Sequence, residues 1–86
     1  MMQAEKVVEI TIASSLELID IITLTADHFA KLSGFDEEEL YRINLAVRES
    51  VANAIEHGNK YNAEKNVEAR FCLTELSLSV SIRDFG

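Results

Sequence analysis

Three polar side chains in this sequence have the types and spacing that phosphate chemistry uses. Glu49 and Asn53 are four residues apart in a predicted helix, and Asp84 lies at the end of a predicted strand. Because four residues make about one helical turn, Glu49 and Asn53 project side by side. An amide oxygen can coordinate a Mg²⁺ ion that also holds phosphates, and a neighbouring carboxylate can accept a proton from an attacking hydroxyl. The alternative interpretation of the pair is a solvated helix face.

The helix that carries this pair is predicted to run from Asp36 to about His57. Asp36 is a good N-cap residue, the glutamates after it put negative charge at the positive helix end, and Gly58 supplies a C-terminal stop. Five apolar residues recur at helical spacing and predict a buried stripe: Leu40, Ile43, Val47, Val51 and Ala54. Glu49 and Asn53 lie nearly opposite this stripe, and His57 continues the polar side.

Asp84 interrupts the pattern of the last predicted strand. Positions 76, 78, 80 and 82 are Leu, Leu, Val and Ile, and they alternate with Ser and Arg. Because side chains alternate along a strand, position 84 belongs to the same inward face. A carboxylate there needs a partner, and an acceptor-only group suits the amino group of a buried adenine. The alternative is that the strand has already ended and that Asp84 begins an exposed turn with Gly86.

The first part of the chain predicts a strand followed by a helix. Residues 7–12 alternate as a strand does, and Ser14 and Ser15 can cap the helix that follows. Gly34 ends that helix. Its core-facing residues recur at helical spacing: Leu18, Ile19, Ile22, Ala26, Phe29 and Ala30.

The second part of the chain predicts a polar loop and a hairpin. Residues 59–66 are polar, and residues 67–73 alternate as a strand does. The dipeptide Thr74-Glu75 is a tight connection to the last strand, so the two strands form an antiparallel hairpin. The order strand, helix, helix, strand, strand predicts an α+β fold, with helices packed on one face of a mixed or antiparallel sheet.

Composition excludes several classes of function. The net charge is -7, with eight basic residues scattered among fifteen acidic ones, so direct binding of nucleic acid is not expected. No run of residues is long enough to span a membrane, and the polar segment Met1–Lys6 is unlike a signal peptide, which predicts a cytoplasmic protein. The single cysteine, Cys72, is expected on the exposed face of its strand in an incidental role. Lys60 and Lys65 could meet phosphate, although a solvated loop is the preferred interpretation.

Two windows of the sequence resemble a known family. The stretch DEEELYRINLAVRESVANAIEHGNKYN resembles the N-box helix of the GHKL ATPase superfamily, and within it the anti-sigma factor serine kinases. The ending IRDFG resembles the first half of the G1 box, Asp-x-Gly-x-Gly. The signature Glu-x-x-x-Asn-Ala, followed by His-Gly, is met by Glu49, Asn53, Ala54, His57 and Gly58.

The resemblance implies a role for each matching residue. Asn53 would ligate Mg²⁺, and Glu49 would act as general base or position the attacking group. Asp84 would bind the adenine amino group, and Gly86 would permit close approach of the backbone to the base. His57 would lie near the phosphates, although a histidine near a helix end also stabilises the helix dipole.

The resemblance also implies a fold and an activity. Residues 1–86 would form a single partial ATP-binding domain of the Bergerat type, with the N-box helix at about 36–58 and the start of the G1 box at 84–86. Such a protein binds ATP or ADP with Mg²⁺, sequesters a sigma factor and phosphorylates an anti-anti-sigma partner as a serine/threonine kinase.

The match to the family pattern stops at Gly86, before the second glycine of the G1 box and the glycine-rich lid. We therefore expect a truncated or naturally shortened form that is inactive as a kinase. The exposed edge of the last strand predicts a homodimer or a strand-swapped assembly. Two alternative functions stay open, a non-catalytic dimerising interaction module and the ATPase portion of another two-component-type signalling protein.

Overall fold

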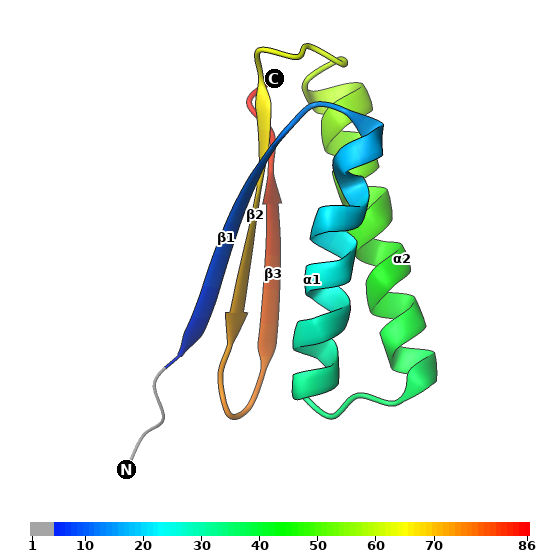
Figure 1. The fold of residues 1–86 in the computed structure, drawn as a ribbon, viewed down its shortest axis with the longest axis vertical. Helices are drawn as coiled ribbons and strands as arrows, with labels where there is room; N and C mark the ends of the chain where they lie inside the picture. Colours follow the sequence, from blue (N-terminus) through cyan, green and yellow to red (C-terminus); the bar gives the residue numbers. More distant parts are fainter. Residues whose placement is uncertain (1–4) are drawn as a thin grey trace.

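Two helices cover one face of a three-stranded sheet in the computed structural model, which describes residues 5–86 (Figure 1). The elements are β1 (Lys6–Ala13), η1 (Leu16–Leu18), α1 (Ile19–Leu32), α2 (Glu37–Asn53), η2 (Ala54–Gly58), β2 (Asn66–Leu73) and β3 (Leu78–Arg83). The strand order is β1-β2-β3, and both pairs are antiparallel. The predicted α+β class is confirmed. Most of the polar N-terminal segment lies outside the described residues.

The core lies between the sheet and the two helices. The rings of Phe29 on α1 and Phe71 on β2 stack there with centroids 5.8 Å apart. The other members of the buried cluster come from every main element except β3, and they are Ile12, Ile19, Ile22, Ala26, Val47, Val51, Ala54, Ile55, Val67 and Ala69. The helical and strand periodicities therefore identified most of the core, because each apolar stripe faces the opposite layer.

Strand β3 is less covered than the central strand β2. It pairs with β2 alone, so it forms one edge of the three-stranded sheet. Its helix-facing residues Leu78, Val80 and Ile82 are half-buried, whereas Val67, Ala69 and Phe71 on β2 are buried. The open edge and partly covered side chains leave a groove between α2 and β3.

The start of α2 is capped by hydrogen bonds within one turn. The Glu39 backbone N–H donates to Asp36 Oδ1 over 2.8 Å, and the Asp36 N–H donates to Glu39 Oε1 over 3.2 Å. These reciprocal bonds form a capping box, which satisfies two backbone donors at the helix start. The predicted N-cap is confirmed, as is Gly34 at the end of α1, where φ is +83°.

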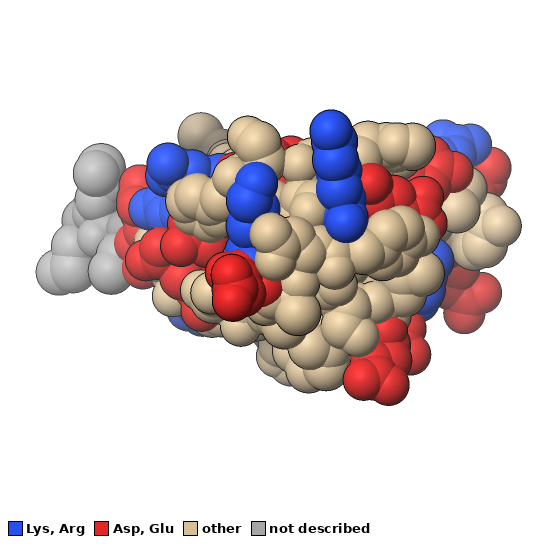
Figure 2. All heavy atoms as spheres, turned by 90° about the horizontal axis from the view of Figure 1, so that it is seen from above, with Lys and Arg blue, Asp and Glu red and all other residues tan. Residues whose placement is uncertain are grey.

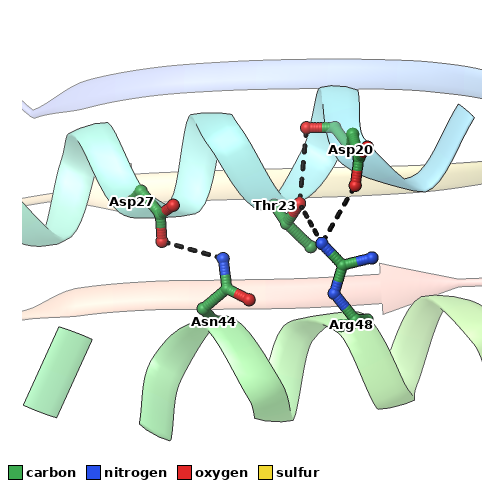
Figure 3. Close-up of polar contacts among 5 residues, drawn as sticks. All are labelled: Asp20, Thr23, Asp27, Asn44 and Arg48. Atoms are coloured by element: carbon green, nitrogen blue, oxygen red, sulfur yellow. Dashed lines mark hydrogen bonds and ion pairs between the residues drawn. The ribbon is translucent and has the colours of Figure 1, made fainter. Parts of the chain in front are cut away.

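Polar side chains join α1 to α2 on their outer surface (Figure 3). Asn44 Nδ2 donates to Asp27 Oδ1 over 3.0 Å. Arg48 Nη2 donates to Asp20 Oδ1 over 2.9 Å and to Thr23 Oγ1 over 3.3 Å. The Arg48–Asp20 pair is largely exposed and contributes little stability, whereas Thr23 is buried and the Asn44–Asp27 bond is part-buried.

The hairpin between β2 and β3 differs from the predicted tight connection at Thr74-Glu75. The strands are joined by four residues, 74–77, and β3 begins at Leu78. The Thr74 hydroxyl accepts from the backbone N–H groups of Leu76 and Ser77, while the Thr74 N–H donates to the Ser77 carbonyl. This local network closes the turn and leaves Leu76, predicted to face inward, 97% exposed.

Two further expectations were wrong. Cys72 is buried, although strand parity predicted the exposed face. Ser15 makes no side-chain capping bond, and the chain enters α1 through the short 3₁₀ turn η1. Ser14 instead turns inward, and its hydroxyl donates to the carbonyl of Lys65.

Among the described residues, no helix is long and apolar enough to cross a membrane.

Candidate functional site

A polar groove lies between the end of α2 and the end of β3. Its volume is about 620 Å³, within the range of small-molecule sites. It is lined by Ser50, Asn53, Ala54, His57, Gly58, Val80, Ile82 and Asp84. The fold therefore brings together three of the predicted site residues, Asn53, His57 and Asp84, from segments about thirty positions apart in the sequence.

Glu49 is not among the residues that line this groove. It lies one turn before Asn53 on α2, and four residues correspond to a rotation of about 40° around the helix. That rotation carries Glu49 to the solvent side of Asn53, where it is exposed. Ser50 faces the groove on that turn instead, and the sequence did not single it out.

Asp84 combines features of the two predicted alternatives. Strand β3 ends at Arg83, so Asp84 lies outside the sheet and is exposed. Its carboxylate nevertheless lines the groove, on the side that strand parity predicted, and Oδ1 accepts from the Gly86 N–H over 3.2 Å. The carboxylate is an acceptor at the groove wall and is not a charge buried in the core.

Two glycines let the end of β3 approach the end of α2. A Cβ atom on Gly58 would lie within 3.0 Å of the Asp84 carboxylate, and a Cβ on Gly86 would overlap the Gly58 carbonyl. Side chains at these positions would push the two segments apart. Gly58 was predicted only as a helix stop, so its contact with Asp84 is a second role that the sequence reasoning missed.

The helix end is wider than a regular α-helix. The Asn59 N–H donates to the Ala54 carbonyl, five residues earlier, over 2.7 Å, which closes the π-helical turn η2. Turns of this kind occur frequently at functional sites. After it, Lys60 and Tyr61 have positive φ values of 51° and 58°. The turn directs Asn59 inward, where it is 1% exposed.

Asn59 was predicted only as part of a polar loop, and its burial was missed. Its Nδ2 donates to Ser14 Oγ and to the Asn66 carbonyl, both over 2.9 Å. Its Oδ1 accepts from the Phe85 N–H over 2.8 Å. A loop asparagine has no sequence signature that separates a solvated side chain from one that joins three segments.

Charged groups at this end of the molecule are mixed. Figure 2 views the molecule from the end that is uppermost in Figure 1, and it shows single Lys or Arg side chains among acidic and uncharged residues. Lys60 is exposed and Lys65 is half-buried. His57 is largely exposed, with Nε2 4.0 Å from Glu56 Oε2. Among residues 5–86, this face shows no single broad basic patch of the kind that binds nucleic acid (Figure 2).

Tyr61 is a titratable group beside the helix end. The pKa of the Tyr61 phenol is raised above its ordinary value. Partial burial is the largest cause, and a hydrogen bond to the Glu56 side chain and the negative charge of Glu56 make smaller contributions. The raised pKa keeps the phenol protonated, as a hydrogen-bond donor, to a higher pH than in a free tyrosine.

The groove continues as an apolar hollow along α2 and β3. This part has a volume of about 380 Å³. It shares Ser50, Val80 and Ile82 with the polar end, and it is further lined by Phe35, Ile43, Ala46, Val47 and Leu78. The groove thus has an apolar wall next to a few convergent polar groups, which is the usual composition of a ligand site.

The polar end of the groove carries the two groups that the resemblance assigned to the adenine amino group and to Mg²⁺. Asp84 offers an acceptor for an amino group, and Asn53 offers an amide oxygen on the opposite wall. Residues 5–86 contain no group of three or more His, Cys, Asp or Glu that could hold a metal ion by themselves. Mg²⁺ does not need such a cage, because it is commonly bound through one or two protein oxygens with phosphates and water completing the shell.

Comparison with known proteins identifies relatives along most of the chain. Serine-protein kinase RsbW from Bacillus subtilis is 30% identical over 79 residues, covering 92% of this chain and 49% of the relative. RsbW from Bacillus pumilus is 31% identical over 81 residues, covering 92% of this chain and 50% of the relative. RsbW from Bacillus licheniformis is 28% identical over 86 residues, covering 100% and 54%. The chain spans about half the length of these curated relatives.

A family comparison agrees with the fold and with the groove. Residues 12–86 match the histidine kinase-like ATPase domain, a region that includes both helices, all of β2 and β3, and every residue lining the groove. The chain therefore belongs to the histidine kinase-like ATPase domain family.

Proposed function

We propose that the groove between α2 and β3 binds ATP or ADP, with Asp84 accepting a hydrogen bond from the adenine amino group. The observation that carries this proposal is the convergence of Asp84 and Asn53 on one groove, from two segments that match the family. Gly58 and Gly86 keep the two segments close enough for both side chains to reach one ligand. Mg²⁺, when bound, neutralises phosphate charge, and the Asn53 amide oxygen would be its protein ligand.

The whole protein is proposed to act as an anti-sigma regulatory factor and serine/threonine protein kinase. Its partners would be a sigma factor, which it sequesters, and an anti-anti-sigma protein, which it phosphorylates. The serine-protein kinases that match the chain support this proposal. Glu49 would act as general base or position the attacking hydroxyl. The proposed compartment is the cytoplasm.

Calorimetric titration of the 86-residue chain with Mg-ADP tests the nucleotide site. Asn53→Ala removes the proposed metal ligand, and Asp84→Asn replaces one acceptor oxygen of the carboxylate with an NH₂ donor and removes its charge. Each is expected to weaken binding about tenfold or more. Asn44→Ala is a matched control, since Asn44 bonds to Asp27 on the outer helix surface. If wild type binds no nucleotide, or if all three variants bind equally, the proposal is wrong.

A dimerising interaction module is a second candidate function. It is favoured by the apolar hollow beside the polar groove and by the unpaired side of β3 within the described sheet. The predicted homodimer and the predicted lack of kinase activity in these 86 residues both stay predictions. Light scattering above micromolar concentration checks the first, and transfer of radiolabelled phosphate to an anti-anti-sigma protein checks the second.

A further inference from the structure

We propose that Asn59 is the residue that positions Asp84 for recognition of the adenine amino group. This inference rests on the proposed nucleotide site and extends it to a residue outside the groove lining. Asn59 follows η2 directly and is 1% exposed, so its side chain is cut off from solvent. A buried amide is costly unless its polar atoms are paired, and both atoms of this amide have protein partners.

The partners of Asn59 come from three separate segments. Nδ2 donates to Ser14 Oγ, between β1 and η1, and to the Asn66 carbonyl at the start of β2. Ser14 in turn donates to the Lys65 carbonyl, which ties the same two segments together. These bonds hold the Asn59 amide in one orientation. Its remaining atom, Oδ1, is thereby aimed at the Phe85 N–H, 2.8 Å away.

The bond to Phe85 is the one that concerns the ligand site. Phe85 follows Asp84 directly and lies beyond the end of β3, so no strand pairing holds it. The bond from Asn59 fixes the peptide group that joins Asp84 to Phe85. Because this peptide group is attached to the Asp84 Cα, the bond also fixes the position from which the Asp84 side chain extends toward Gly58 and the groove. Loss of the bond would free the segment to move away from α2, and Asp84 with it.

A double-mutant cycle separates positioning from general stability. Asn59→Ala and Asp84→Ala are made singly and together, with Asn44→Ala as the control, and each chain is titrated with Mg-ADP and Mg-IDP. IDP carries a carbonyl oxygen where ADP carries the amino group, so a carboxylate acceptor rejects it. Wild type and Asn44→Ala should prefer ADP about tenfold or more.

Asn59→Ala is expected to abolish most of this preference, as Asp84→Ala does, and the double variant should lose no more than Asp84→Ala alone. Such non-additivity is the signature of one residue acting through another. If Asn59→Ala keeps the preference for ADP, or if the two losses add, the proposal is overturned. A purely structural role would lower the affinity for both nucleotides and leave their ratio unchanged.

Amide hydrogen exchange at Phe85 gives a readout that needs no nucleotide. The Phe85 amide should be protected in wild type and in Asn44→Ala, and it should exchange about tenfold faster or more in Asn59→Ala. Equal exchange in Asn59→Ala and wild type overturns the proposal. If wild type binds neither nucleotide, the proposed function fails, and exchange at Phe85 alone decides whether Asn59 holds the Asp84 segment. Should Asn59→Ala fail to fold, Asn59→Ser replaces it, since a serine side chain is too short to reach Phe85.

Discussion

The two ends of α2 are held in place by different kinds of contact. At the start, Asp36 and Glu39 cap the helix through reciprocal bonds between residues three apart. At the end, Asn59 bonds to Ser14, Asn66 and Phe85, which lie 45, 7 and 26 positions away in the sequence. The start has a structural role alone, whereas the end forms the wall of the candidate site. Local signals therefore place the helix start, and long-range polar bonds arrange the end that lines the candidate site.

Removing the long-range network should have the largest effect on stability. Asn59→Leu keeps a similar volume but leaves the Phe85 N–H and the Asn66 carbonyl without their partner. We expect the free energy of unfolding to fall by about 3 kcal/mol, as measured by urea denaturation followed by circular dichroism. Asn44→Leu removes one part-buried side-chain bond and should lower it by less than about 1 kcal/mol. Equal losses in the two variants would contradict the contrast between the two regions.

Gly58, at the end of η2, offers a second way to test the end that lines the candidate site. In Gly58→Ala the new Cβ would lie within 3.0 Å of the Asp84 carboxylate, so Asp84 must move. We expect Mg-ADP affinity to fall about tenfold, equivalent to about 1.4 kcal/mol, in a calorimetric titration. Gly34→Ala is the matched control, because its Cβ meets open space at a positive φ and should cost stability without changing affinity. Unchanged affinity in Gly58→Ala would show that the contact does not matter.

The start of α2 should respond more weakly than its end. Asp36→Ala removes the capping box and should lower the free energy of unfolding by about 1 kcal/mol. Asp36→Ser should restore most of that loss, because serine also caps well. The affinity for Mg-ADP should be unchanged in both. A drop in affinity that exceeds the loss of stability would mean that the two ends of α2 are coupled.

The smallest predicted effect concerns Tyr61, beside the end of α2. Glu56 contributes to the raised pKa of the Tyr61 phenol through a hydrogen bond and through its charge. Glu56→Gln should therefore lower that pKa, by removing the negative charge that disfavours the phenolate. Absorbance titration in a Tyr41→Phe background reports Tyr61 alone, since the chain has two tyrosines. A pKa that rises in Glu56→Gln would contradict this account of the helix end.

The fold and half of the site could be predicted from the sequence, because those parts depend on local pattern. Periodicity predicted both helices, the sheet and most of the core, and the N-cap at Asp36 was confirmed. The parity of β3 placed Asp84 on the side of the groove, even though the strand ends one residue earlier.

The remaining features depend on contacts between distant segments. The roles of Asn59 and Ser14 come from a polar network that joins both ends of the sequence, and no local pattern encodes it. The closeness of Gly58 to Asp84 depends on how far β3 extends along α2. The burial of Cys72 depends on packing, and the exposure of Leu76 depends on the length of the turn before β3. Strand parity predicts neither.

The proposed adenine nucleotide site lies between the end of α2 and the end of β3. Amide chemical shifts of the isotope-labelled chain, recorded during titration with Mg-ADP, test it most directly. We expect the largest changes at residues 50–59 and 84–86, on the two walls of the groove, with little change at residues 36–40, where α2 begins. Absence of any change, or changes centred away from both walls, would contradict the account.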